Sequence, residues 1–207
     1  MTLTALYEKA AKHLAKDAKL KPVIDRVGLC TLTPRADEPF SMLVRCVIAQ
    51  QISGKAADAI SGKLAAKLKN RVTPKTVAAL SDDDLRVCGI SGPKQRAIRS
   101  ILQHGTDNKH FYKSMPELGD EEFIEAVTAI KGIGPWSADM LLMFGYGRTD
   151  VLPVGDYGLK AGVRDLYGLD DLPKPPQLIA IAEAWRPYRS IATWYIWRSK
   201  GPVPNSN

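Results

Sequence analysis

The chain has 207 residues, with 29 Lys or Arg against 22 Asp or Glu, so its formal net charge is +7. A hydrophobic fraction of 45% and a charged fraction of 25% are those of a folded protein and exclude a disordered one. Apolar runs such as 140–144 are far shorter than the roughly 20 residues that span a bilayer, which predicts no transmembrane helix.

Cysteine and histidine are too scattered to build a covalent or metal-bound framework. The three cysteines, Cys30, Cys46 and Cys88, are widely spaced, and the three histidines do not cluster with them. This pattern excludes a disulfide scaffold, a zinc site and an iron–sulfur cluster. The lysine-bearing segment 1–21 is not a secretory signal. We therefore expect an intracellular protein with no membrane partner, in the cytoplasm and nucleoid of a bacterium or the nucleus of a eukaryote.

Helical periodicity runs through almost the whole chain. In the first segment, apolar residues recur with the spacing of one helix face, at Leu3, Leu6, Ala10 and Leu14. The run 40–50 is dense enough in apolar residues to predict the buried central helix of a lobe. Further helices are expected over 53–68, 91–104, 121–130, 136–144, 157–166, 177–185 and 188–199, with short ones opening at Thr73-Pro74 and Ser81. No segment alternates long enough to predict a strand, so the class is all-α.

The segment Lys131-Gly132-Ile133-Gly134-Pro135 separates two of these helices. Two glycines around one apolar residue allow a tight hairpin whose backbone can approach another chain closely. Exposed amides at the following helix start could bind a DNA phosphate, although a plain helix–helix corner has the same glycine pattern. Asp156 likewise allows two interpretations: it could be a catalytic carboxylate or the N-cap of helix 157–166.

The order of these features resembles a known family. The arrangement is similar to that in the helix-hairpin-helix superfamily of DNA glycosylases: a hairpin is followed by the helix 136–144, the loop 151–155 and then Asp156. Within it, the resemblance is to the inducible 3-methyladenine DNA glycosylases. Two further stretches carry the same likeness, namely 47–53, with the sequence Val-Ile-Ala-Gln-Gln-Ile-Ser, and 182–190, with Ile196-Trp197 beyond it.

The resemblance implies how the chemistry would be divided among residues. Asp156 would be the catalytic carboxylate. Gln51 would be the wedge that fills the space left by a flipped nucleotide, or else an ordinary helix-terminal residue. The base pocket would be lined by Trp136, Tyr157 and Trp197, although a single aromatic is more often core than pocket.

The same resemblance implies where the chain grips DNA. The residues expected to contact the phosphates are Lys131, Gly132, Ile133, Gly134, Ser91 and Lys94. The turn at Ser91 is equally consistent with a plain N-cap. A structural Na⁺ or K⁺ would bind the main-chain oxygens of Thr128, Ile130 and Ile133, and no other cofactor is implied.

Trp136 separates two chemistries within the superfamily. Glycosylases that also nick the strand attack the sugar with a lysine directly after the hairpin, and this chain has tryptophan there. The resemblance therefore implies a monofunctional hydrolase, acting as a monomer on double-stranded DNA, that excises alkylated purines such as 3-methyladenine and 7-methylguanine in base excision repair. The alternatives are a non-lyase glycosylase for another damaged or mismatched base and a non-catalytic DNA-binding module.

The expected architecture has two helical lobes with a DNA cleft between them. The central lobe would comprise residues 22–130. The second lobe would comprise residues 1–21 and 131–207, and would hold both the hairpin and Asp156.

Overall fold

The computed structural model describes residues 2–34 and 38–199, and every regular element within these ranges is helical. The predicted all-α class is therefore confirmed. The chain forms two compact units: a terminal unit, Met1–Pro34 with Gly147–Asn207, and a central unit, Arg35–Tyr146. Among the described residues, none of the helices combines the length and apolar character needed to cross a membrane.

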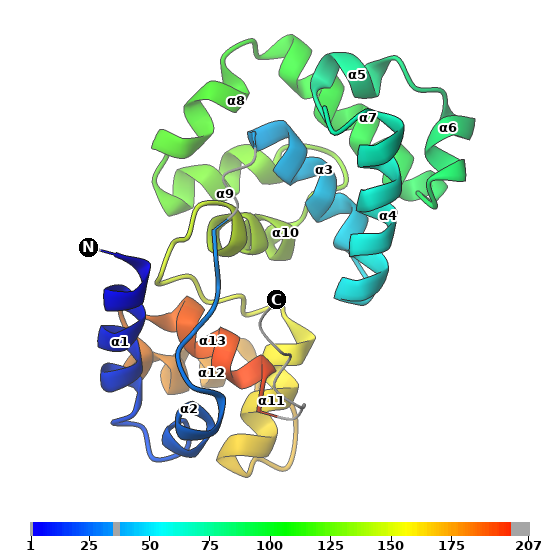
Figure 1. The fold of residues 1–207 in the computed structure, drawn as a ribbon. Helices are drawn as coiled ribbons and strands as arrows, with labels where there is room; N and C mark the ends of the chain where they lie inside the picture. Colours follow the sequence, from blue (N-terminus) through cyan, green and yellow to red (C-terminus); the bar gives the residue numbers. More distant parts are fainter. Residues whose placement is uncertain (1, 35–37, 200–207) are drawn as a thin grey trace. The chain divides into compact units, whose positions relative to one another are not determined.

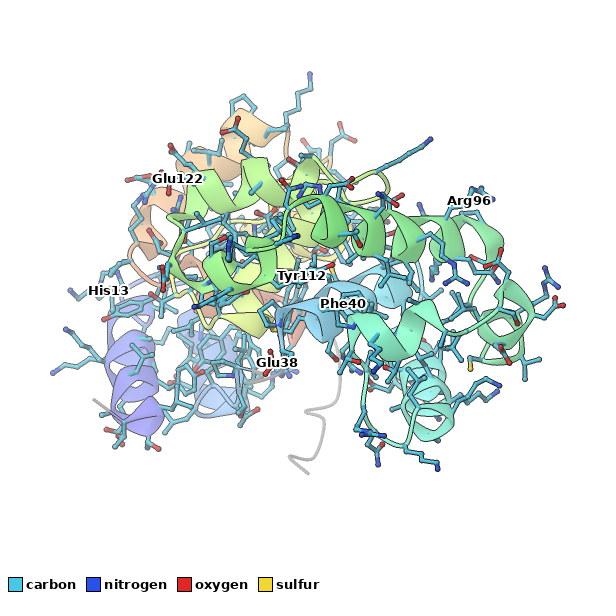
Figure 2. All side chains as sticks on the ribbon, turned by 90° about the horizontal axis from the view of Figure 1, so that it is seen from above. His13, Glu38, Phe40, Arg96, Tyr112 and Glu122 are labelled. Atoms are coloured by element: carbon cyan, nitrogen blue, oxygen red, sulfur yellow. The ribbon has the colours of Figure 1, made fainter. Side chains whose placement is uncertain are left out.

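The central unit is built around α3 (Pro39–Ala49), as the apolar run predicted. Seven of the eleven residues of α3 are buried, and α4 and α7 pack against it (Figure 1). At its start the Phe40 ring meets the Tyr112 ring edge-on, with 5.6 Å between centroids (Figure 2). The other helices of this unit are α4 (Gly54–Lys67), α5 (Pro74–Ala78), α6 (Asp82–Val87), α7 (Gly92–Asp107), α8 (Phe111–Ser114), η1 (Met115–Glu117), α9 (Asp120–Thr128), α10 (Pro135–Met140) and η2 (Leu141–Gly145).

The terminal unit packs around α13 (Arg189–Trp197), in which all residues from Ser190 to Ile196 are buried. Helices α1, α2 and α11 all contact α13 (Figure 1). The other helices of this unit are α1 (Leu3–Leu14), α2 (Lys21–Val27), α11 (Tyr157–Tyr167), α12 (Pro175–Ala182) and η3 (Glu183–Trp185). Trp185 and Trp194 are 0% and 3% exposed, so they belong to the core of this unit.

Side-chain caps set several helix starts where the sequence placed them. Ser53 caps α4, with its hydroxyl accepting from the Ala56 amide at 3.3 Å. Ser81 and Asp84 form a reciprocal capping box at α6. One start differs from the expected helix 121–130. Helix α9 begins at Asp120 with Gly119 as N-cap, because the Glu122 carboxylate accepts from the Gly119 amide at 3.2 Å.

The boundaries of the two units differ from those expected for the lobes. Helix α2 belongs to the terminal unit because it packs on α13, and Arg26 donates to the main-chain oxygen of Arg198 at 3.0 Å. The hairpin belongs to the central unit because Gly132 packs against Ala97 of α7. The expected cleft between lobes stays a prediction.

Candidate functional site

The hairpin between α9 and α10 is shaped by one glycine. Gly132 has φ +95°, and a Cβ built on it would lie 2.6 Å from the Cβ of Ala97. Both observations disfavour any side chain at this position. The Ile133 amide donates to the Ile130 carbonyl at 3.0 Å and the Ile133 side chain is buried, which anchors the turn. Lys131 and the Gly132 backbone are left exposed, as a phosphate-binding hairpin requires.

Gly134 is the N-cap of α10. Its carbonyl accepts from the amides of Ser137 at 2.9 Å and Ala138 at 3.2 Å, and Pro135 follows at the first helical position. A Cβ on Gly134 would meet no atom within 4 Å. The hairpin therefore needs glycine at position 132 for packing, whereas position 134 lies in open space.

Gln51 follows the end of α3 and is exposed, with φ +58°. The residue before it carries a contact that the sequence did not reveal. The Gln50 amide nitrogen donates to the Gly132 carbonyl at 3.0 Å and to the Ser137 hydroxyl at 2.9 Å. The residue before the predicted wedge is thus hydrogen-bonded to the predicted phosphate-binding hairpin, within the central unit. No sequence signal separates Gln50 from Gln51, because both belong to one polar pair at a helix end.

At the start of α7, the two residues predicted to contact a phosphate, Ser91 and Lys94, have different environments. Ser91 is the N-cap by its backbone, but its side chain makes no capping hydrogen bond. The Lys94 ammonium donates to the Ile48 carbonyl at 2.7 Å, and burial lowers the pKa of this group. Lys94 therefore caps the C-terminal end of α3, a structural role that the sequence did not predict. Its phosphate contact stays a prediction.

Asp156 is the N-cap of α11 and is half-buried. Its Oδ1 accepts from the Leu159 amide at 2.6 Å and from the Trp197 indole Nε1 at 2.8 Å. Both donors meet the same carboxylate oxygen, one from the first turn of α11 and one from the last residue of α13. The N-cap interpretation of Asp156 is confirmed, and its catalytic role stays a prediction.

The loop leading to Asp156 is pinned to the start of α13. Arg189 donates to the Asp150 carboxylate at 2.8 and 3.1 Å, and to the Asp150 main-chain oxygen at 2.7 Å. The Ser190 hydroxyl accepts from the Val151 amide at 2.9 Å, and the Ser190 amide donates to the Thr149 carbonyl at 2.9 Å. Arg189 is thus engaged as an ion-pair partner of Asp150.

The three predicted pocket aromatics have different environments. Trp136, on α10, and Trp197, on α13, are half-buried, whereas Tyr157 is 70% exposed. Tyr157 and Trp197 lie in the terminal unit with Asp156, and Trp136 lies in the central unit with the hairpin. An exposed phenol directly after the aspartate is available to a ligand, since the core does not use it.

A family model for the HhH-GPD superfamily of base excision DNA repair proteins matches residues 44–187, which include the hairpin and Asp156. The chain belongs to this superfamily. Trp197 lies outside the matched range.

Curated relatives cover most of the chain. The alkylbase DNA glycosidase-like protein mag2 of Schizosaccharomyces pombe is 30% identical over 93% of both chains. DNA-3-methyladenine glycosylase 1 of the same yeast is 34% identical, over 78% of this chain and 72% of its own length.

Solved HhH-GPD structures share the fold. A 3-methyladenine DNA glycosylase (Mag1) of Schizosaccharomyces pombe, in complex with abasic DNA, superposes with a TM-score of 0.82 at 32% identity, covering 92% of this chain and 95% of that one. A DNA-3-methyladenine glycosidase from Bacillus halodurans has a TM-score of 0.75 at 36% identity, with coverage of 91% and 87%.

Proposed function

We propose that this protein is a monofunctional DNA glycosylase that flips and excises alkylated purines from double-stranded DNA, acting as a monomer. The observation that carries the proposal is the Asp156 carboxylate, held on one oxygen by the Leu159 amide and the Trp197 indole. A chain that only gripped phosphates would need the hairpin but no oriented carboxylate. The relatives named for 3-methyladenine support the substrate class.

In the proposed reaction, the bond between the sugar C1′ and the base nitrogen breaks and its electron pair leaves with the base. Positive charge develops on the sugar, as in the oxocarbenium-like transition state of a glycosidase. The Asp156 carboxylate would stabilise that charge and accept a proton from the water that adds to C1′. Because the carboxylate is held by two donors, little reorganisation is needed as the charge develops.

The aromatic side chains fit a substrate that carries its own charge. An N-alkylated purine is a cation and a good leaving group, and electron-rich rings attract it by about 0.5–2 kcal/mol. Trp136, Tyr157 and Trp197 would supply such faces. The residue after the hairpin, Trp136, has no amine to form a Schiff base with the sugar, so we propose that the product is an intact strand with an abasic site.

The hairpin would bind a phosphate through its backbone, with the side chain of Lys131 beside it. The main-chain oxygens of Thr128, Ile130 and Ile133 are neutral oxygen donors, the type that can replace the hydration shell of Na⁺ or K⁺. Among the described residues, no group of three or more His, Cys, Asp or Glu side chains is placed to hold a metal ion. When bound, a monovalent cation would add positive charge under the DNA phosphate.

Base release from methylated duplex DNA tests the proposal. Free 3-methyladenine and 7-methylguanine are quantified by chromatography, and strand cleavage is measured before and after alkali. The expected result is release of both bases, with nicking only after alkali treatment. Nicking without alkali would contradict the monofunctional assignment. Binding without release of any alkylated base would contradict the substrate class.

A further inference from the structure

The chain leaves α3 through a strained turn. Gln50 is the C-cap, with φ −55° and ψ 129°, and Gln51 then has φ +58°. The left-handed region is disfavoured for residues with a Cβ, and such a conformation persists only where the surroundings hold it. The Gln51 side chain is exposed and contributes no core packing. The restraint on this turn must therefore come from the residues around Gln51.

Two polar side chains, those of Gln50 and Lys94, hold the residues at the end of α3. The Gln50 amide nitrogen contacts the Gly132 carbonyl of the hairpin at 3.0 Å and the Ser137 hydroxyl of α10 at 2.9 Å, which uses both of its N–H groups. The Lys94 ammonium holds the Ile48 carbonyl at 2.7 Å. The last turn of α3 is thus tied to α7, and the residue next to Gln51 is tied to the hairpin itself.

A third side chain, that of Cys46, also links α3 to the start of α10. The Cys46 thiol donates to the Ser137 carbonyl at 3.3 Å, and burial raises its pKa to about 12, so it remains a neutral donor. Ser137 is only 2% exposed. Cys46 of α3 and its C-cap Gln50 therefore both hydrogen-bond to Ser137 at the start of α10. Of these two residues, Gln50 is the one that reaches the hairpin backbone and directly precedes the strained residue.

We propose that Gln50 is a positioning residue that couples the phosphate-binding hairpin to the wedge residue Gln51. This inference rests on the proposed function, in which the hairpin holds a phosphate and Gln51 enters the duplex. The hairpin fixes the register of the protein on the backbone, and the wedge has to enter the stack at one distance from it. Gln50 sets that distance because its side chain ends on the hairpin and its backbone leads into Gln51.

A glutamine amide suits this role for a chemical reason. It offers two N–H donors, and the groups facing it are a carbonyl oxygen and a hydroxyl oxygen. Leucine would fill the volume and leave the Gly132 carbonyl without this donor. Glutamate would direct a carboxylate at the Gly132 carbonyl, which is repulsive.

The test follows wedge insertion without base release. A duplex carries a tetrahydrofuran abasic analogue opposite 2-aminopurine, whose fluorescence rises when it is unstacked, and binding is measured by anisotropy on this duplex and an undamaged one. The wild-type protein is expected to raise the fluorescence and Gln51→Ala to abolish the rise. Gln50→Leu should lose most of the fluorescence rise. Its preference for abasic over undamaged DNA should fall about tenfold, while its affinity for undamaged DNA should stay within about twofold of wild type.

A matched control is Gln103→Leu, which removes an exposed glutamine of α7 that contacts Asp107 at 2.8 Å. It should behave as wild type. Ser137→Ala removes one of the two acceptors of Gln50 and should give an intermediate loss. This variant also serves as the test if circular dichroism shows that Gln50→Leu does not fold.

Three outcomes would overturn the proposal. The first is a wild-type fluorescence rise in Gln50→Leu. The second is an equal loss of affinity for abasic and undamaged DNA, which would mean that Gln50 only maintains the hairpin. The third is the absence of any fluorescence rise with the wild-type protein, which would show that Gln51 is not a wedge. None of these readouts depends on base excision, so failure of the proposed enzymatic activity is detected separately.

Discussion

Trp197 donates its indole N–H to the carboxylate oxygen of Asp156 that also caps α11, with 2.8 Å between Nε1 and Oδ1. The two residues lie 41 positions apart in the chain, at the start of α11 and the end of α13. One contact thereby joins two helices of the terminal unit at the predicted catalytic group. It also gives Trp197 an observed contact, in addition to its predicted place in the base pocket.

Asp156→Asn should abolish base release and leave DNA binding intact. Asparagine is as good an N-cap as aspartate, and its side-chain oxygen can accept from Leu159 and Trp197 as before. The fold is therefore expected to survive while the negative charge is lost. Single-turnover release of 3-methyladenine measures the first effect, and binding to abasic duplex measures the second. Turnover at the wild-type rate would remove Asp156 from the mechanism.

Trp197→Phe should lower the rate of base release about tenfold, because the carboxylate loses one of its two described donors. Phenylalanine keeps an aromatic face toward a substrate, so KM is expected to change less than kcat. Steady-state kinetics on a methylated duplex separate the two constants. An effect confined to KM would assign Trp197 to stacking alone.

Gly132→Ala should destabilise the protein by about 2 kcal/mol and weaken DNA binding. The added Cβ meets Ala97 at 2.6 Å, and φ at this residue is +95°. Gly134→Ala is the matched control, since its Cβ would enter open space with φ −107°. The control should stay within about 0.5 kcal/mol of wild type in thermal or urea unfolding. Equal losses in the two variants would contradict the packing argument.

Arg189→Met should lower the free energy of unfolding by about 2 kcal/mol and slow base release. It removes the bidentate partner of the Asp150 carboxylate, which is 27% exposed and keeps its ion pair with Arg186. It also releases the loop that leads to Asp156. Arg86→Met provides the comparison, because it breaks an exposed ion pair with Asp83 and should cost less than about 0.5 kcal/mol. Urea unfolding of both variants tests whether the more buried ion pair contributes more to the free energy of unfolding.

DNA binding should weaken steeply with salt, because each phosphate contact releases counterions. A plot of log K against log salt for the abasic duplex gives the number of such contacts. Lys131→Ala is expected to reduce the slope by about one, since the exposed Lys131 is predicted to face one phosphate. An unchanged slope would show that Lys131 makes no phosphate contact.

The helices and their caps could be predicted because they depend on residues close in sequence. Ser53 caps α4 and Ser81 pairs with Asp84 at α6 as the local pattern indicated. The buried face predicted for the first helix was less accurate, because Leu3 is 44% exposed and Tyr7 is buried instead. That choice depends on which face of α1 meets α13, and local spacing does not contain that information.

The sequence by itself determined the all-α class, the hairpin and the family resemblance, and it placed Asp156 directly before a helix. Each of these follows from residue types at short, fixed spacings, where backbone geometry leaves few alternatives. Only the tertiary structure decided that Gln50 binds the hairpin, that Lys94 caps α3 and that Trp197 holds Asp156. These contacts join residues 41 to 82 positions apart, and the packing of whole helices, not any local preference, brings such residues together.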